Sequence, residues 1–259
     1  LVMNIFKKYL ISIAAGLLSL LALSITVSFP IWWLFLSVVL VWLVVSVFLY
    51  YKLYFGTEGF WYDVILLVVS QISFVGLVIL VEWEFLRWLL VVLCTVFIFL
   101  LFLKLHKNKD GLSFQQKPIR RMKMMLWVFD VYAIVTTIFA ISLFFPSTPF
   151  WLLAILGGVV VGAISIIIWE MYFPGKLKGF LLWSVLLTLS MVEIIWVVHL
   201  LPLGYLVLGL LVTWLWFLLQ IFVRFHLMPQ GIIWKKQMYF LIFNFILFFL
   251  ILFFVVRWI

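Results

Sequence analysis

One carboxyl group stands inside a long apolar segment of this chain and could do chemistry there. Glu193 lies within the apolar segment 180–200, about 10 Å from its end at 1.5 Å per residue. A charge in the middle of a membrane-spanning helix costs roughly 2.5–3.5 kcal/mol on insertion scales, so ionisable groups there are functional candidates. We interpret Glu193 as a candidate substrate or ion ligand. The alternative, which the pattern favours, is a structural role, either as a protonated group hydrogen-bonded between helices or as a side chain that reaches a polar interface.

Two amides accompany this carboxyl group in other apolar segments. Gln71 lies in segment 64–81 and Gln220 in segment 203–223. Amides inside membrane helices usually form interhelical hydrogen bonds worth about 0.6–2 kcal/mol. We expect that role, and we keep contact with a substrate or ion as the alternative for both.

Two further carboxyl groups stand near the ends of apolar segments. Asp130 lies one turn inside segment 126–145 and follows Arg121 and Lys123, whereas Glu170 ends segment 151–169. Side chains near a helix end reach the membrane interface by extending their polar tips toward water. We expect both carboxyl groups to lie at the cytoplasmic interface beside basic partners.

Basic side chains gather at the segment ends that share this interface. Cations at helix C-termini complement the helix dipole, and basic clusters beside membranes bind lipid phosphates. The candidates for contact with anionic lipids are Lys104, His106, Arg120, Arg121, Arg224 and His226. The competing interpretation, which we favour, is that these residues only set the topology of the chain.

Motifs of known catalytic centres are missing from the sequence. It holds no HExxH pair, no GxSxG turn and no GxxxxGK[ST] phosphate loop. The three histidines are dispersed and Cys94 is the single cysteine, so no metal-ligand spacing is visible. We expect no metal and no cofactor, and we favour a non-catalytic role over an enzymatic one.

The composition predicts the elements that must position these side chains. Of the 259 residues, 69% are hydrophobic and 10% are charged, and the mean hydropathy is +1.42. A soluble domain needs more polar surface, and a disordered chain needs far fewer apolar residues. The apolar runs do not alternate as barrel strands would. The predicted fold class is all-α, a polytopic integral membrane helix bundle.

Nine apolar segments are long enough to count as membrane spans. Tight proline turns such as Ser28-Phe29-Pro30 and Pro146 to Pro149 separate several of them. The predicted spans are 10–27, 31–51, 64–81, 85–105, 126–145, 151–169, 180–200, 203–223 and 238–256.

The basic residues predict the orientation of these spans. Of the 17 lysines and arginines, all but Arg87 and Arg257 fall on one side of the membrane if the spans alternate. The positive-inside rule makes that side cytoplasmic. We therefore expect a multi-pass protein of the cell membrane with a cytoplasmic N-terminus and an outer C-terminus. The net charge of +9 then reflects topology, and we expect no nucleic acid partner.

The two halves of the sequence resemble each other. Residues 7–30 and 123–146 both run from a lysine to Phe-Pro, Tyr54-Phe55 matches Tyr172-Phe173, and Phe102 to His106 matches Phe222 to His226. This order predicts two parallel four-helix repeats, residues 1–106 and 122–226, and a final helix at 235–259. Segment 10–27 could be a signal peptide, but its counterpart is internal, so we expect it to be a retained helix.

A stripe of small residues marks one segment for close helix packing. Ala154, Gly158 and Gly162 are spaced four apart in segment 151–169, a pattern that lets another helix approach.

The sequence as a whole favours a non-catalytic membrane component or a subunit of a larger complex. The alternatives are a small-solute or ion transporter that uses Glu193 and a lipid-handling membrane enzyme. The expected partners are the lipid bilayer, including anionic lipids, and other membrane subunits or a second copy of the chain.

Overall fold

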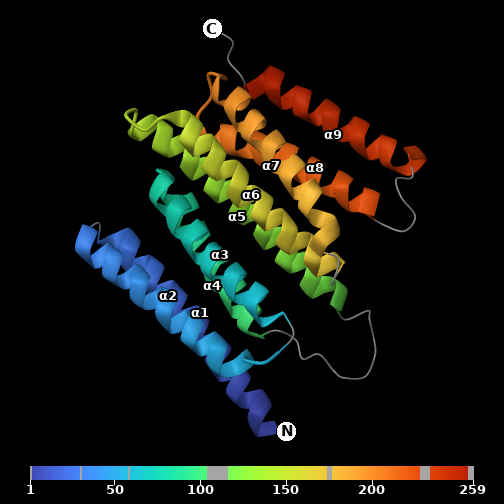
Figure 1. Ribbon diagram of the computed structural model, residues 1–259. Helices are drawn as coiled ribbons and strands as arrows, with labels where there is room; N and C mark the ends of the chain where they lie inside the picture. The colour runs from blue at the N-terminus through green and yellow to red at the C-terminus, as the bar shows by residue number, and fades with distance from the viewer. Residues whose placement is uncertain are drawn as a thin grey trace. The chain divides into compact units, whose positions relative to one another are not determined.

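The computed structural model describes residues 2–29, 31–57, 59–103, 116–173, 177–227 and 234–255. All regular structure in these ranges is helical, and the chain runs through the helices in the order shown in Figure 1. The helices are α1 (Val2–Ser28), α2 (Trp32–Tyr54), α3 (Phe60–Leu80), α4 (Glu84–Leu103), α5 (Gln116–Phe144), α6 (Phe150–Tyr172), α7 (Leu177–His199), α8 (Tyr205–Leu227) and α9 (Trp234–Val255).

Eight of these helices are long and apolar enough to cross a membrane. They are the first eight, and the predicted ninth span corresponds to α9, whose described apolar stretch Met238–Leu250 is shorter. Helices satisfy their own backbone hydrogen bonds, which lipid cannot do for them. The predicted all-α membrane bundle is therefore confirmed, and the chain is a multi-pass helical membrane protein.

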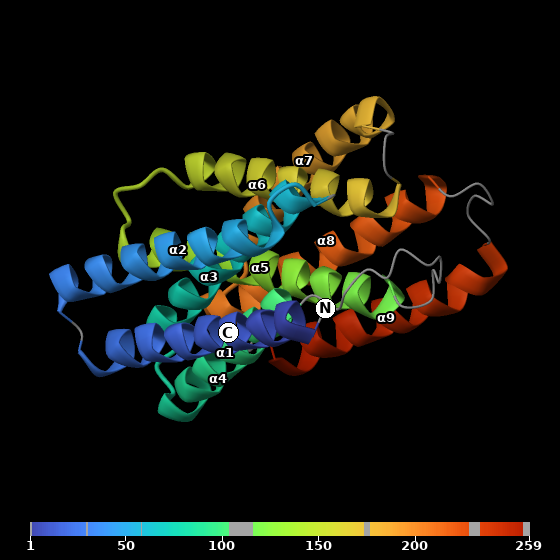
Figure 2. The same ribbon diagram turned by 90° about the horizontal axis from the view of Figure 1, so that it is seen from below.

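The helices form two compact units, Leu1–Ala133 and Ile134–Ile259. In the first unit α1 packs along α4 (Figure 2) and against α2, while α3 packs against α2 and α4. In the second unit α7 packs against α6 and α8. The boundary between the units falls inside α5, so it marks packing and does not test the predicted repeats.

A tryptophan–serine hydrogen bond joins two helices in each unit. The Trp42 indole donates to Ser19 Oγ at 3.1 Å in the first unit. The Trp216 indole donates to Ser165 Oγ at 2.9 Å in the second unit. All four residues are buried, where an unpaired indole N–H would cost free energy.

The small-residue stripe of α6 lies where α7 comes closest. A Cβ on Gly158 would meet Val192 Cγ2 at 2.4 Å and the Thr188 carbonyl oxygen at 3.0 Å, and a Cβ on Gly162 would meet Thr188 Oγ1 at 2.0 Å. Ala154 is fully buried on the same stripe. The partner of this stripe is therefore α7 of the same chain.

Similar aromatic contacts join the second and third helices of both predicted repeats. The Phe60 ring lies 6.0 Å from Tyr50 and 5.9 Å from Phe55. The other cluster has the same order along the chain, because the Phe180 ring lies 6.1 Å from Trp169 and 6.3 Å from Phe173. The predicted duplication stays a prediction.

Candidate functional site

Helix α3 carries the polar face of the first unit. Asp63 is 3% exposed in the first turn of α3, where a carboxylate complements the helix dipole. The turn that leads into the helix uses Gly56 and Gly59 with φ of 80° and 75°, a left-handed backbone that favours glycine. This turn brings Asp63 next to the C-terminal end of α2, within reach of Tyr50.

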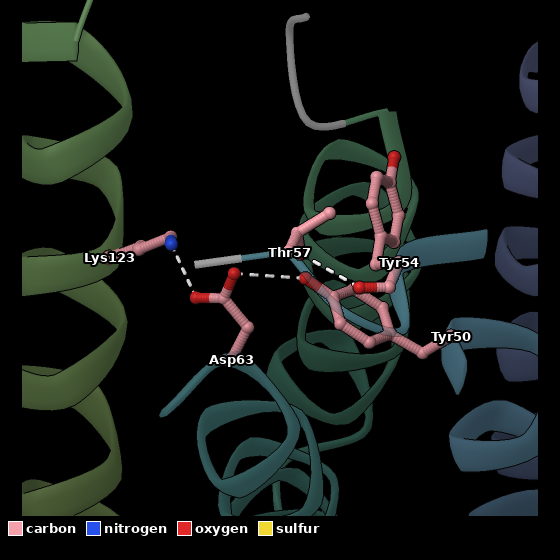
Figure 3. Close-up of polar contacts among 5 residues, drawn as sticks. All are labelled: Tyr50, Tyr54, Thr57, Asp63 and Lys123. Carbon is pink, nitrogen blue, oxygen red and sulfur yellow. Dashed lines mark hydrogen bonds and ion pairs between the residues drawn. The ribbon is translucent and has the colours of Figure 1, made fainter. Parts of the chain in front are cut away.

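Asp63 joins three helices of the first unit (Figure 3). The Tyr50 hydroxyl of α2 donates to Asp63 Oδ2 at 3.0 Å. The Lys123 ammonium group of α5 forms an ion pair with Asp63 Oδ1. Each carboxylate oxygen thus receives a donor, and Lys123 keeps 17% of its side chain exposed. The arrangement is a mostly buried ion pair at the helix ends that the sequence assigns to the cytoplasmic side.

The end of α2 is held in place beside this ion pair. The Tyr54 hydroxyl donates to the Phe102 carbonyl oxygen of α4, and the Thr57 hydroxyl donates to the Tyr54 carbonyl oxygen at 2.8 Å. Tyr54 and Tyr50 also pack their rings 4.8 Å apart. These contacts fix the position from which Tyr50 reaches Asp63.

A small cavity of about 70 Å³ adjoins the ion pair. Tyr50, Asp63 and Lys123 line its polar side, and leucines of α4 with Ile119 and Met122 of α5 line the rest. Sites for organic ligands usually measure about 300–1,000 Å³, whereas one water needs about 30 Å³. This cavity fits a few waters and is too small for a phospholipid headgroup.

A second polar contact between α3 and α5 lies deeper in the membrane. The Ser70 hydroxyl donates to Asp130 Oδ2 at 2.8 Å, and Asp130 is 0% exposed. The span of α5 begins at Ile119, which places Asp130 about 16 Å inside it at 1.5 Å per residue. The expectation that Asp130 lies at the interface is wrong, because α5 begins at Gln116 and Lys123 pairs with Asp63.

Two oxygens beside this contact, Asp130 Oδ1 and Ser73 Oγ, make no hydrogen bond of regular geometry to a described residue, although Ser73 lies close enough to interact with the Asp130 carboxyl group. Ser73 follows Ser70 by three positions, so the two serines share one face of α3. Buried polar atoms are usually paired, and an unpaired one indicates a functional group or an unseen small ligand.

Glu193 lies apart from these buried groups. It is exposed on α7, between the exposed side chains of Leu189 and Trp196. Gln220 is fully buried in α8, and its amide atoms have no partner in the described part of the chain. Gln71 is fully buried as well and donates to Ser46 Oγ at 2.9 Å. Glu193 and Gln220 thus occupy opposite environments within one unit.

Four of the six lipid-contact candidates can be placed. Lys104 and His106 lie outside the described residues. Arg121 is exposed and Arg120 is half-buried at the start of α5. The two remaining candidates contact aromatic rings: Arg224 Cζ lies 4.6 Å over the Tyr172 ring, and the His226 ring lies 4.9 Å from Trp183.

Sequence reasoning missed Asp63 and misplaced Asp130. A signal was available for both, because Asp63 and Lys123 are 60 positions apart, as are Ser70 and Asp130. Equal separations are expected where two parallel helices pack in register. Two pairs of polar residues with equal separation are too few to predict a helix contact from the sequence alone.

No protein-family model, curated protein or solved structure matches this chain. Among the described residues, no group of three or more His, Cys, Asp and Glu side chains could hold a metal ion.

Proposed function

We propose that this protein is a non-catalytic membrane component that assembles with a different membrane protein through the outward face of α7. The observation that supports the proposal is the exposure of Glu193 inside a membrane span. The face is defined by Leu182, Leu186, Leu189, Glu193 and Trp196, all of them exposed. Spacings of four and three residues place them on one stripe of the helix, as in packed helix pairs.

The depth of Glu193 makes a protein partner more favourable than lipid. Glu193 precedes His199, the last residue of α7, by about 9 Å along the helix axis. No hydrogen bond or ion pair joins it to another described residue. A carboxyl group left in lipid costs free energy, whereas a hydrogen bond across helices recovers part of that cost.

The chemistry of the partner follows from this carboxyl group. We expect a membrane-spanning helix with a cationic or amide side chain opposite Glu193. The described lysines and arginines of this chain lie near helix ends, as Lys52 and Arg87 do. A second copy packed about a two-fold axis would set Glu193 against Glu193, so a different protein is the better complement.

The two alternatives from the sequence receive less support. A transporter that uses Glu193 needs this side chain in a cavity, but Glu193 is exposed and the cavity beside Asp63 has other lining residues. A lipid-handling enzyme needs room for a headgroup, and that cavity is too small. We keep three further expectations as part of the proposal. The protein lies in the cell membrane, its N-terminus is cytoplasmic and its C-terminus is outside, and its basic helix ends contact anionic lipids.

Site-specific crosslinking in native membranes tests the assembly. A photoreactive residue at Leu189 should crosslink to a different protein, and one at Val159, an exposed position at similar depth on α6, should not. The crosslink should be lost with Glu193→Leu and kept with Glu193→Gln, because an amide still forms a hydrogen bond.

The identity of the crosslinked product decides the proposal. A partner with a polar side chain inside a membrane span supports it. A crosslink to a second copy of the chain, or equal yields from Leu189 and Val159, overturns it. Lipid adducts alone from Leu189 overturn it as well.

A further inference from the structure

We propose that Asp130, Ser70 and Ser73 form an intramembrane site for one exchangeable monovalent cation, H⁺ or Na⁺. The site lies between α3 and α5 within the first compact unit. It does not depend on the assembly through α7.

The charge of Asp130 requires a neutralising group at this depth. Asp130 is fully buried, and the group that donates a hydrogen bond to it is the neutral hydroxyl of Ser70. The nearest basic group of α5 along the helix, Lys123, is paired with Asp63 two turns away. An unpaired buried carboxylate is strongly unfavourable. One bound monovalent cation brings the net charge to zero, whereas a divalent cation would leave an excess charge.

The two serines can serve both the empty and the occupied site. Hydroxyl groups rotate, so each donates a hydrogen bond to a carboxylate or turns its lone pairs toward a cation or a carboxylic O–H. Ser70 already contacts Asp130 Oδ2. Asp130 Oδ1 and Ser73 Oγ make no hydrogen bond of regular geometry to a described residue, and Ser73 lies close enough to interact with the Asp130 carboxyl group. These oxygens are the positions that a proton or a sodium ion would join.

The next polar groups on the interface side of the site belong to the Asp63–Lys123 ion pair. Asp63 lies one heptad before Ser70 on α3, about 10 Å along the axis, and Lys123 beside it is partly exposed. The cavity adjoins this ion pair. On α4, the buried thiol of Cys94 lies close enough to interact electrostatically with Asp130. Among the described residues, the titratable and charged groups on this side of the site are therefore Cys94, Asp63, Lys123 and Tyr50.

Infrared spectroscopy of the purified full-length protein tests the site. The carbonyl band of a protonated carboxyl group reports Asp130 directly when the spectrum of Asp130→Asn is subtracted. Both proteins carry Glu193→Gln, which removes the exposed carboxyl group inside α7. The band is followed between about pH 5 and about pH 9, in sodium-free buffer and with added Na⁺ or K⁺.

A band that disappears as the pH rises shows proton exchange, and a band that Na⁺ but not K⁺ abolishes shows sodium binding. Either result supports the site. A band that neither pH nor Na⁺ changes means permanent protonation, and a band missing in all buffers means a permanent charge. Both of these results overturn the proposal.

Ser73→Ala separates a cation site from a structural role. Ser73 Oγ makes no hydrogen bond of regular geometry to a described residue, but it lies close enough to interact with the Asp130 carboxyl group. A purely structural role therefore predicts a loss of stability that does not depend on Na⁺ or pH, and an unchanged response of the band to both. Loss of one oxygen ligand should instead shift the Na⁺ or H⁺ concentration at half-effect by about tenfold. Carbodiimide labelling of Asp130, measured by mass spectrometry in a Cys94→Ala background, should shift by the same factor.

Discussion

The hydrogen bond from Ser70 to Asp130 lies one heptad beyond the Asp63–Lys123 ion pair along the helix axes. Both contacts join α3 to α5, and both advance by seven residues on each helix. Two helices can keep this register over two turns only if they run in the same direction. Helices α3 and α5 thus share polar contacts at these two positions, one heptad apart.

The Asp63–Lys123 ion pair should show unequal costs when either partner is removed. Lys123→Met leaves a carboxylate that is 4% exposed and should cost about 3 kcal/mol of unfolding free energy. Asp63→Asn should cost less, because Lys123 can extend toward water and the amide oxygen still accepts from Tyr50. Unfolding in mixed detergent micelles measures both, with Arg121→Met as the exposed control.

The double variant completes this experiment. Asp63→Asn with Lys123→Met removes both charges, so its stability should lie near that of Asp63→Asn alone. Additive losses from the two substitutions would contradict a coupled pair and would mean that each residue acts through other contacts.

The buried indole–hydroxyl contacts predict equivalent losses in the two units. Ser165→Ala leaves the Trp216 indole N–H unpaired and should cost about 1–3 kcal/mol. Ser19→Ala should do the same to Trp42. The two serines are bonded alike, since each also donates to the carbonyl oxygen four residues earlier in its own helix. Thermal unfolding in detergent measures both variants.

Replacement of the indole tests the cause of that loss. Trp216→Phe removes the N–H, so Ser165→Ala should cost less in a Trp216→Phe background than in the original chain. An equal cost in both backgrounds would assign the loss to packing of the serine and not to the hydrogen bond.

The sequence predicted the helices well because apolar length is a one-dimensional property. The segment 64–81 agrees with α3 within a few residues, and the stripe at Gly158 and Gly162 indicated a close helix contact. The span within α5 was predicted to begin seven residues too late, at residue 126 instead of Ile119. Arg120, Arg121 and Lys123 lower the hydropathy there, although such long side chains are good helix formers.

The sites depend on neighbours that the sequence does not reveal. The error at the start of α5 placed Asp130 at the interface, whereas its carboxyl group lies near the middle of the span. Asp63 was not singled out because its partner lies 60 residues away and no motif joins them. The depth of Glu193 within its span was predicted from the sequence. Whether Glu193 faces another helix depends on how α7 packs, and in the structure Glu193 is exposed.

The predicted orientation can be tested at two described turns. Single cysteines at Thr57, between α2 and α3, and at Ser147, between α5 and α6, should react with a membrane-impermeant thiol reagent from opposite sides. Thr57 should react only after the cell membrane is opened, because the positive-inside rule makes its side cytoplasmic. Cys94 is buried and is replaced by alanine in both proteins. Labelling of both positions in intact cells would overturn the topology.

The close contact of α6 with α7 should tolerate a methyl group at Gly162 better than at Gly158. The added Cβ of Gly162→Ala would meet the Thr188 hydroxyl, a side-chain atom that can rotate away. The Cβ of Gly158→Ala would meet Val192 Cγ2 and the Thr188 carbonyl oxygen of the backbone, so α7 itself must move. We expect Gly158→Ala to cost about 1–3 kcal/mol and Gly162→Ala to cost less.

Removal of the Thr188 hydroxyl distinguishes the two positions. Thr188→Ala should recover the stability of Gly162→Ala, because the clashing atom is gone, and should leave Gly158→Ala destabilised, because the backbone oxygen remains. Gly179→Ala is the control, since a Cβ there meets no atom within 4 Å. Thermal unfolding in detergent ranks the five variants. Equal rescue at both glycines would mean that the added methyl group meets the Thr188 side chain at both positions, and not the backbone of α7.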